Sequence, residues 1–251
     1  MIHFVGAGCG ATDLITLRGK RHIENADVII YAGSLINKEL LQYAKKECAL
    51  YDSAKMTLEE IIDIISAAER DGLVTVRLHT GDPSLYGAIG EQMRELKRLG
   101  IDYDITPGVS AFSGAAASLK TEYTLPDVSQ TVIITRAAGR TDVPERENIR
   151  SLASHGATMV LYLSTGLLEK VSEELITGGY DAGTPAAIIY KATWPDEKIF
   201  RCTVGTLRQT AEANGITKTA LIAVGKFLES SFSRSCLYDP GFSTEFREAS
   251  K

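Results

Sequence analysis

The chain has few cysteines, the residues that cross-link secreted proteins. Its 251 residues include four cysteines, and no two of them form a CxxC pair. Neither a zinc site nor a disulfide framework is therefore expected, and scattered thiols are typical of a reducing cytoplasm. No apolar run approaches the length of a membrane span, and the first residues enter a predicted strand without a signal peptide. These absences predict a soluble cytoplasmic protein that does not enter a membrane.

Positive charge is in the minority. The chain carries 27 Lys and Arg against 32 Asp and Glu, which leaves a net charge of -5. This balance argues against a nucleic-acid-binding surface over the whole protein, although it is compatible with a local basic trough. We therefore expect no nucleic-acid partner.

Common catalytic and metal-binding motifs are also absent. The sequence contains no P-loop (GxxxxGK[ST]), no HExxH and no GxSxG elbow. The four histidines are His3, His22, His79 and His155. They show no metal-ligand spacing, so no metal site is expected. Of these, His79 opens the central loop described below and is the best candidate for a proton-handling group, although a structural role at a strand end fits equally well.

One cofactor motif is matched only formally. Residues 6–11 fit GxGxxG/A, the dinucleotide fingerprint. That motif requires a helix that opens directly from the glycines and an acid at the end of the second strand. Here the expected helix cap is Thr16, and the second strand ends in Tyr31-Ala32-Gly33-Ser34. A nicotinamide cofactor is therefore disfavoured, and a non-catalytic nucleotide-binding module is kept as an alternative.

Predicted strands alternate with predicted helices along the chain. Strands are expected over residues 2–5, 27–31, 73–78, 101–105, 131–135, 158–163, 185–191, 198–204 and 220–224. This alternation indicates the α/β class with a largely parallel sheet. The strands on either side of residues 194–197 are expected to form a hairpin. With 251 residues, the chain can form two domains, which we place over 1–119 and 120–230, followed by a tail over 231–251 that is expected to be poorly ordered.

The expected helices begin at recognisable caps. Thr16 precedes a helix that ends near Asn25, Asn37 precedes one that runs to Lys46, and residues 57–60 resemble a capping box. Further helices are expected over 88–99, after Ser110, and over 144–155, 167–177 and 206–213.

Three of the predicted strands end in glycine-containing turns, at Gly6, Gly81 and Gly108. Right-handed crossovers bring such turns to one edge of a parallel sheet, where open α/β sheets bind ligands. In the central turn Pro83 keeps Asp82 extended, so that a carboxylate is held on a stiff loop. An ordinary strand-to-helix turn is the alternative for this loop taken alone.

The second half adds a local basic site at predicted strand ends. Arg136 and Arg140 flank a glycine-containing loop, and Lys191 lies at the end of another predicted strand. The guanidinium fork suits carboxylates because it offers two parallel hydrogen bonds. These residues are candidate anchors for an acidic ligand, and a solvated loop with incidental arginines is the alternative.

Several stretches together resemble the tetrapyrrole methyltransferases, the class III enzymes that use S-adenosylmethionine. The stretches are VGAGCG with DLIT, TGDP and PGVS, and the resemblance extends from Ile2 to about Leu228. The stretches YAGSL, MTLEE, HTGDP, TRAAGRT and YKATWPDE are most similar to the branch that methylates carbon 11 of precorrin-4 or cobalt-precorrin-4 in cobalamin synthesis. In the first loop the family usually reads GAGPGD, whereas this chain has Cys9 and Ala11; we interpret Cys9 as a small packing residue.

The resemblance implies two α/β domains with S-adenosylmethionine in the cleft between them, a tetrapyrrole substrate and a homodimer. Carried over by position, the cofactor contacts are Cys9, Gly81, Asp82, Leu85, Ser110, Ala111, Leu163, Ala192 and Ala220. The candidate substrate anchors are Ser34, Arg136, Arg140 and Lys191, and the candidate bases are Asp82, His79 and Tyr31. Methyl transfer from a sulfonium needs neither a metal nor a covalent enzyme intermediate, and it leaves S-adenosylhomocysteine. Another tetrapyrrole methylase, acting on a different precorrin or on uroporphyrinogen III, is the nearest alternative.

Overall fold

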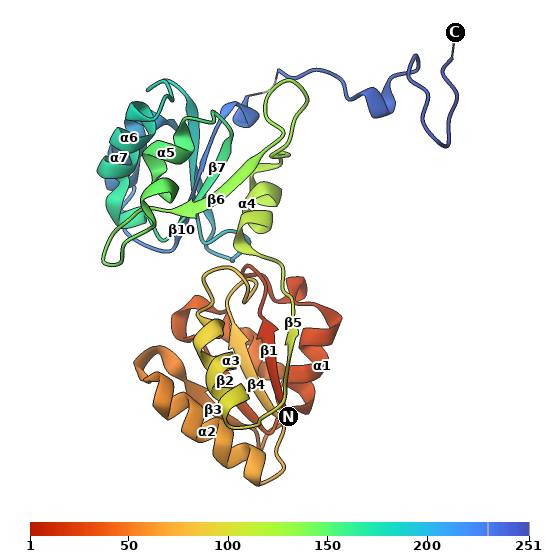
Figure 1. The fold of residues 1–251 in the computed structure, drawn as a ribbon, viewed down its shortest axis with the longest axis vertical. Helices are drawn as coiled ribbons and strands as arrows, with labels where there is room; N and C mark the ends of the chain where they lie inside the picture. The colour runs from red at the N-terminus through yellow and green to blue at the C-terminus, as the bar shows by residue number, and fades with distance from the viewer. Residues whose placement is uncertain (230, 251) are drawn as a thin grey trace. The chain divides into compact units, whose positions relative to one another are not determined.

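The computed structural model describes residues 1–229 and 231–250, with every side chain among them except that of Ser34. The chain forms two compact units (Figure 1). The first is Met1–Ala115 together with Lys191–Glu197, and the second is Ala116–Tyr190 together with Lys198–Lys251. The domain boundary near Leu119 stays a prediction. The return of residues 191–197 to the first unit was not expected from the sequence.

The first unit is built on a five-stranded parallel sheet. Its strands are β1 (Ile2–Gly6), β2 (Val28–Tyr31), β3 (Ala49–Asp52), β4 (Thr75–His79) and β5 (Tyr103–Thr106), in the order β3-β2-β4-β1-β5. Its helices are α1 (Leu17–Asn25), α2 (Leu58–Arg70) and α3 (Ile89–Arg98), and α4 (Ala111–Leu119) begins in this unit and ends in the second. Strand β3 was not predicted: it is a four-residue edge strand that is largely exposed, and its apolar stretch is short.

Both faces of this sheet are covered. On one face Ile2, Phe4 and Ile30 pack with apolar residues of α2 and α3. On the other face the core includes Val5 of β1 and Ile23 of α1. Sheets covered on both faces have buried strands, which explains the apolar runs in the sequence.

Three predicted caps of this unit, Thr16, Asn37 and Thr57, are confirmed, and the helix predicted after Asn37 is wrong in type. The Thr16 side chain accepts a hydrogen bond from the Gly19 N–H, and Thr57 forms a capping box with Glu60. Residues Lys38–Tyr43, however, form a 3₁₀ helix. The Asn37 side chain accepts from the N–H only two residues on, and the chain is extended again at Ala44, shortly before it enters β3.

The second unit has a mixed sheet. Strands β6 (Val132–Arg136), β7 (Thr158–Tyr162), β8 (Pro185–Tyr190), β9 (Lys198–Thr203) and β10 (Ala220–Val224) take the order β6-β7-β10-β8-β9. Only β6 and β7 are parallel, since β10 runs antiparallel to both β7 and β8, and β8 pairs with β9 in the predicted hairpin. The expectation of a largely parallel sheet is therefore correct for the first unit and wrong for the second, because the hairpin makes β8 and β9 antiparallel and β10 lies antiparallel between β7 and β8.

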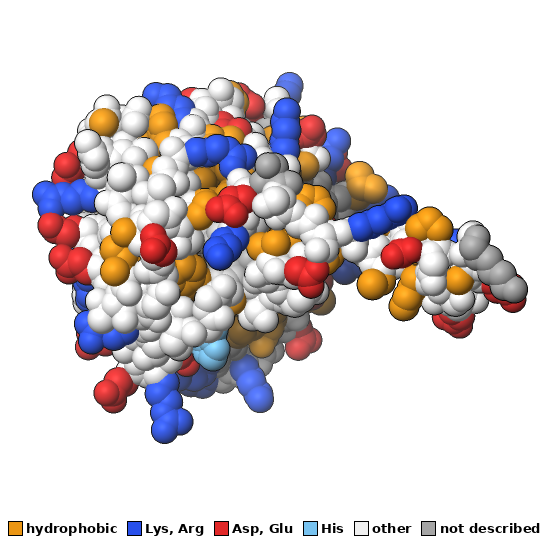
Figure 2. Space-filling model, turned by 90° about the horizontal axis from the view of Figure 1, so that it is seen from above, with side chains coloured by type: hydrophobic (Ala, Val, Ile, Leu, Met, Phe, Trp, Pro, Cys, Tyr) orange, Lys and Arg blue, Asp and Glu red, His pale blue; other side chains and the backbone are white. Residues whose placement is uncertain are grey.

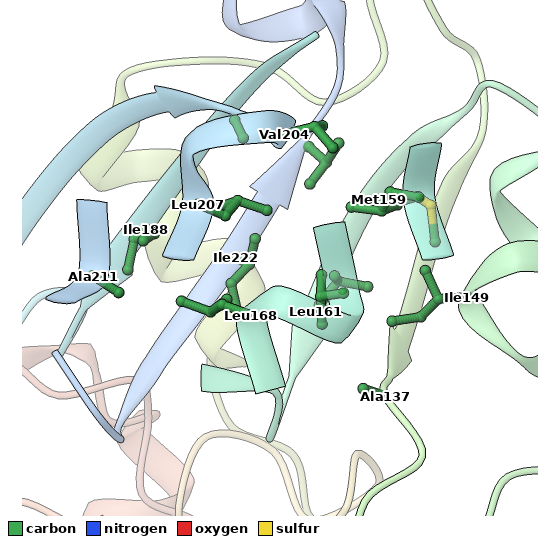
Figure 3. Close-up of a cluster of buried hydrophobic side chains, with 14 of the residues drawn as sticks. Ala137, Ile149, Met159, Leu161, Leu168, Ile188, Val204, Leu207, Ala211 and Ile222 are labelled. Carbon is green, nitrogen blue, oxygen red and sulfur yellow. The ribbon is translucent and has the colours of Figure 1, made fainter. Parts of the chain in front are cut away.

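Helices α5 (Ile149–Ala153), α6 (Leu168–Thr177) and α7 (Leu207–Ala213) complete the second unit. Figure 3 shows their apolar side chains against the sheet: Ile149, Leu168 and Leu207 pack with Met159, Leu161 and Ile222. The helix expected over 144–155 is shorter, because residues 145–147 form a separate 3₁₀ turn and Asn148 caps α5. Among residues 1–229 and 231–250, none of the helices has the length and apolar character needed to cross a membrane.

Candidate functional site

The three predicted glycine turns meet at one edge of the first sheet. Strand β1 lies between β4 and β5, with Gly6 opposite His79 and Val5 opposite Thr106, so their carboxyl ends are neighbours. A Cβ on Gly6 would lie 2.6 Å from Gly108 Cα and 2.6 Å from the Gly81 oxygen. The loops therefore touch backbone to backbone, and a side chain at Gly6 would push them apart.

Hydrogen bonds between main-chain groups join the first two turns. Gly81 N–H donates to the Gly8 oxygen at 2.9 Å, and Gly8 N–H donates back at 3.2 Å. Ala7 N–H donates to the His79 oxygen at 2.7 Å. Gly8 and Gly81 both have positive φ, 81° and 59°, a conformation that favours glycine.

The Asp82 carboxylate ties the second turn to the third. One of its oxygens accepts from the N–H and the hydroxyl of Ser84, and the other accepts from the Gly108 N–H at 2.8 Å. Burial alone would raise the pKa of Asp82, but the hydrogen bonds from Ser84 and Gly108 outweigh it and hold the pKa below its ordinary value. With both oxygens bound by donors, the carboxylate is suited to positioning more than to accepting a proton.

The two other predicted bases differ in accessibility. His79 is 3% exposed, and burial, reinforced by the charge of Arg77, lowers its pKa to about 3. A neutral imidazole buried in this way is poorly placed to exchange protons with a ligand, so the structure disfavours that predicted role. Tyr31 is half-buried at the end of β2, with the Lys38 Nζ 5.6 Å from its ring centroid. Ser34 follows in a 3₁₀ turn, and its side chain lies outside the described part of the structure.

The first glycine turn packs against residues 191–197. The Cys9 thiol is 6% exposed, its sulfur accepts from the Thr193 hydroxyl at 3.3 Å, and burial raises its pKa although that hydrogen bond opposes the shift. The same Thr193 oxygen accepts from the Ala11 N–H at 3.1 Å. A Cβ on Gly114 would lie 2.6 Å from the Cys9 sulfur. These contacts support the interpretation of Cys9 as a packed, protonated thiol.

Three residues of this region were missed by the sequence reasoning. The Trp194 indole lies where a Cβ on Gly10 would be, and Asn37 donates to the Gly10 oxygen at 3.1 Å. Trp194 was predicted to lie in a hairpin connection, and Thr193 and Trp194 both belong to the YKATWPDE stretch of the resemblance, but neither was given a role at the site. The positive φ of Lys191 (49°) and Thr193 (68°) is a backbone feature that the sequence does not signal, because neither residue is glycine.

Lys191 and Ala192 take part in the same segment. The Lys191 ammonium lies 2.7 Å from an Asp196 oxygen and 5.2 Å from the Trp194 ring centroid. Ala192 is buried, with its carbonyl next to Gly10. Lys191 is therefore engaged within its own loop, which weakens its prediction as a substrate anchor.

Further predicted contacts gather around Gly81. A Cβ there would lie 3.4 Å from the Ala111 nitrogen and 3.7 Å from Ser110 Cα. Leu85 is half-buried, and its N–H donates to the main-chain carbonyl oxygen of Asp82 at 3.2 Å. The structure thus brings Gly81, Asp82, Leu85, Ser110 and Ala111 together, with Cys9 nearby on the first turn and Ala192 on the segment that packs against that turn.

Other predicted residues lie along one edge of the second sheet. Ile222 is opposite Leu161 in the antiparallel pair, so Leu163 and Ala220 adjoin at this edge. Leu163 is 69% exposed and has a φ of 52°, an unusual conformation for a branched residue. Arg136, opposite Tyr162 at the end of β6, lies at the same edge.

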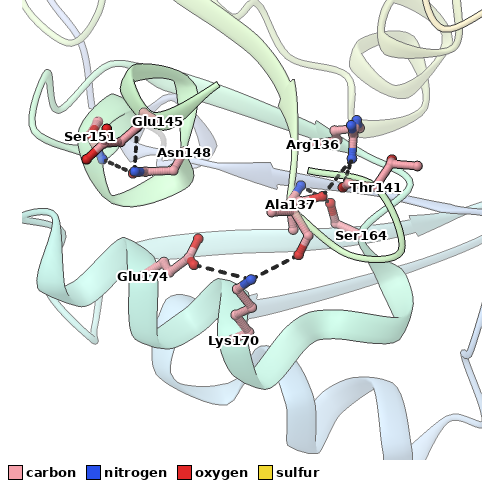
Figure 4. Close-up of polar contacts among 10 residues, drawn as sticks. Arg136, Ala137, Thr141, Glu145, Asn148, Ser151, Ser164, Lys170 and Glu174 are labelled. Carbon is pink, nitrogen blue, oxygen red and sulfur yellow. Dashed lines mark hydrogen bonds and ion pairs between the residues drawn. The ribbon is translucent and has the colours of Figure 1, made fainter. Parts of the chain in front are cut away.

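The Arg136 guanidinium organises the loop that follows it (Figure 4). It donates to the carbonyls of Ala137, Thr141 and Asp142, at 3.3, 3.0 and 2.6 Å. Ser164 accepts from the Ala137 N–H, and Lys170 of α6 donates to the Ala138 carbonyl. Arg140 is carried on this loop and is exposed. Arg136 therefore shapes the loop, and Arg140 is the better placed of the two to meet a ligand.

Away from these loops, one cluster among the described residues has metal-ligand chemistry. His3, His22 and Asp104 offer ligand atoms within 4.8 Å of one another. They come from three elements, so linear spacing could not reveal them. The His3 and His22 rings are stacked at 3.9 Å, and His3 Nδ1 lies 2.9 Å from Asp104, whereas the buried His22 Nε2 has no hydrogen-bond partner among the described residues.

Comparison with known proteins gives one consistent result. The family model described as "Tetrapyrrole (Corrin/Porphyrin) Methylases" matches residues 1–208. The chain is 54% identical to the cobalt-precorrin-4 C(11)-methyltransferase of Methanocaldococcus jannaschii, over 98% of this chain and 96% of the relative. It is 46% identical to the precorrin-4 C(11)-methyltransferase of Pseudomonas aeruginosa, over 94% of each. A solved structure of cobalt precorrin-4 methyltransferase superimposes with a TM-score of 0.89 at 46% identity, covering 91% of this chain and 95% of the other.

Proposed function

Because the chain belongs to the tetrapyrrole (corrin/porphyrin) methylase family, we propose that it is an S-adenosylmethionine-dependent methyltransferase that methylates carbon 11 of precorrin-4 or cobalt-precorrin-4. The observation that carries this proposal is the similarity, over nearly the whole chain, to enzymes named for that reaction. Near-complete coverage of both chains means that the proposal concerns the whole protein and not one shared module.

The turns at Gly6, Gly81 and Gly108 meet backbone to backbone, and we call this surface the backbone cradle. It fits a cofactor that is held through main-chain groups. Side chains at Gly6 or Gly108 would fill or disrupt this cradle, whereas a Cβ at Gly81 meets only ordinary contacts but is opposed by the positive φ. We assign S-adenosylmethionine to the predicted contacts at Cys9, Gly81, Asp82, Leu85, Ser110, Ala111, Leu163, Ala192 and Ala220. When bound, its sulfonium supplies an activated methyl group, so the protein's task is alignment and exclusion of water, which contribute roughly 7–11 kcal/mol in well-oriented reactions.

The residues of the cradle divide this task. Asp82 holds the second and third turns together through Ser84 and Gly108, and so sets the shape of the surface that receives the cofactor. The Cys9 thiol, protonated and packed on Thr193, closes the first turn without offering a nucleophile. Tyr31 is the remaining candidate for moving a substrate proton, since His79 is buried and Asp82 is fully engaged.

Carboxylate side chains of the macrocycle are the groups that the basic residues would recognise. Arg140, exposed on the loop that Arg136 organises, is our first candidate anchor, and Ser34 and Lys191 are secondary ones. On the face shown in Figure 2, basic and acidic side chains are interspersed without an extended basic area, which agrees with a small acidic substrate more than with a nucleic acid. A homodimer, which the resemblance implies, and a cytoplasmic location, which the scattered cysteines indicate, are also part of the proposal.

The decisive experiment is turnover with purified protein. Incubation with S-adenosylmethionine and either precorrin-4 or cobalt-precorrin-4 should add one methyl group, placed on carbon 11 by NMR, and release one equivalent of S-adenosylhomocysteine. A preference of about tenfold in kcat/KM between the two substrates would identify the metal state of the natural one. Methylation of uroporphyrinogen III instead would establish the alternative methylase, and retention of NAD(H) with no binding of S-adenosylmethionine would establish the nucleotide-binding module.

A further inference from the structure

A cation is buried in the middle of the first sheet, next to the loop that carries Gly81 and Asp82. Arg77 of β4 is 5% exposed, and in the described part of the chain no ion pair compensates its charge. A guanidinium without a counter-charge is costly to bury, and an apolar side chain of similar length would fill the same space without that cost. The hydrogen bonds that Arg77 makes therefore need an explanation.

Arg77 has two partners, and they lie on different elements. Its Nε donates to the Gln92 side-chain oxygen of α3 at 3.1 Å, and its Nη1 donates to the Ile30 carbonyl of β2 at 3.1 Å. Gln92 is itself 4% exposed. A guanidinium can only donate, so the amide oxygen of Gln92 must face Arg77, and the amide nitrogen is left to donate elsewhere.

That nitrogen donates to the Ala88 carbonyl at 3.1 Å, at the residue that caps α3. Ala88 is also where the loop over residues 80–88 ends, and the loop begins three residues after Arg77. The chain Arg77–Gln92–Ala88 therefore connects the strand that enters this loop to the residue that leaves it. Two buried side chains, Arg77 and Gln92, thus connect both ends of the loop.

The loop needs such a brace because its backbone is strained. Tyr86 and Ala88 have φ values of 55° and 50°, which are unfavourable for residues with a side chain. A Cβ on Gly87 would overlap the Pro83 carbonyl, so the loop folds back tightly on itself. Strained conformations persist where surrounding contacts over-determine them.

We propose that Arg77 is a positioning residue for the cofactor site: through Gln92 it holds the two ends of residues 80–88 in the arrangement that S-adenosylmethionine binding requires. The inference rests on the proposed function, because it assigns the loop to the cofactor. It adds a role for two buried residues that touch neither cofactor nor substrate in the assignment above.

The substitution Gln92→Glu separates this role from simple burial. A glutamate still accepts from Arg77 and gives it a counter-charge, but it has no N–H to donate to Ala88. Arg77→Met removes the guanidinium that donates to Gln92 and to the Ile30 carbonyl. Thr75→Val is the matched control, because Thr75 lies fully buried in the same strand, on the same face, and its hydroxyl has no partner among the described residues.

Binding of S-adenosylmethionine is measured by calorimetry, and backbone exchange by hydrogen–deuterium mass spectrometry, on folded proteins below their melting temperatures. We expect Gln92→Glu and Arg77→Met to weaken binding by about tenfold or more, and Thr75→Val to leave it within about twofold of wild type. Amides of residues 80–88 should exchange faster in Gln92→Glu, whereas those of α2 should not change. If Arg77→Met does not fold, Gln92→Glu alone decides.

The outcomes are distinguishable. If the wild-type protein and Gln92→Glu bind S-adenosylmethionine equally tightly, the positioning role is overturned and the proposed function stays intact. The same holds if amide exchange in residues 80–88 is unchanged in Gln92→Glu. No binding by the wild-type protein overturns the proposed function and this inference with it. If Thr75→Val weakens binding of S-adenosylmethionine as much as Gln92→Glu does, the effect comes from a general loosening of the core. That result also overturns the inference.

Discussion

The Asp82 carboxylate accepts a hydrogen bond from the Gly108 N–H at 2.8 Å, and it thereby joins two loops that lie 26 residues apart in the sequence. Its other oxygen is occupied by Ser84. A residue that the sequence offers as a base is thus a structural bridge at the candidate site.

Asp82→Ala is expected to lower kcat/KM by about tenfold or more and to weaken S-adenosylmethionine binding, because both loops lose their shared acceptor. Asp82→Asn keeps one acceptor oxygen and should retain more activity than the alanine variant. Steady-state kinetics and calorimetry measure both effects. If Asp82 were the base instead, the asparagine variant would be as inactive as the alanine one, with cofactor binding preserved.

The burial of His79 predicts a specific dependence of stability on pH. Its pKa is about 3 in the folded protein against an ordinary 6.5, so between these values the unfolded chain binds a proton that the folded chain does not. The contribution of neutral His79 to the free energy of unfolding is present above pH 6.5. It is lost as the pH falls toward 3, by up to about 1.4 kcal/mol per pH unit.

Urea unfolding of wild type and His79→Gln across this range tests the point. The wild-type free energy of unfolding should fall more steeply than that of the variant as the pH is lowered. The pH dependence of kcat should be the same in both, because His79 is not expected to exchange protons during turnover. Parallel stability curves would show that His79 is protonated in the folded state.

The packing of Trp194 on Gly10 makes the first glycine turn sensitive to a single methyl group. In Gly10→Ala the added carbon overlaps the indole, so the segment 191–197 must shift, and binding of S-adenosylmethionine should weaken by about tenfold. Trp194 is the only tryptophan of the chain, so its emission reports the displacement directly. Gly90→Ala is the control: a Cβ there meets nothing within 4 Å and lies in α3, so the variant should match or exceed wild-type stability.

Arg136 and Arg140 should be separable by kinetics. Arg140→Ala is expected to raise the KM for the tetrapyrrole about tenfold without changing cofactor affinity, since its side chain is exposed and its removal leaves the loop intact. Arg136→Ala removes the donor to three carbonyls, so amides of residues 137–142 should also exchange faster. Unchanged exchange in Arg136→Ala, with the same KM effect as Arg140→Ala, would instead make Arg136 a direct anchor.

Much of the first unit could be read from the sequence because its signals are local. The caps at Thr16 and Thr57, the apolar strands and the glycine turns at Gly6, Gly81 and Gly108 each depend on a few neighbouring residues. A parallel sheet then brings the turns to one edge, as its crossover geometry requires. The family resemblance rests on the same turns, and the family match confirms it.

The α/β class, the meeting of the three turns and the chemical family could all be predicted from the sequence. The roles of individual side chains at the site became visible only in the folded protein. Asp82 bonds Gly108, Thr193 contacts Cys9 across 184 residues, Arg136 turns back onto its own loop, and His79 and Arg77 are shut away from solvent. Patterns along the chain encode local conformation through spacing and residue type, whereas hydrogen-bond partners and burial depend on which distant segments the fold brings together. For that reason the position of the candidate site was predictable, and the division of roles within it was not.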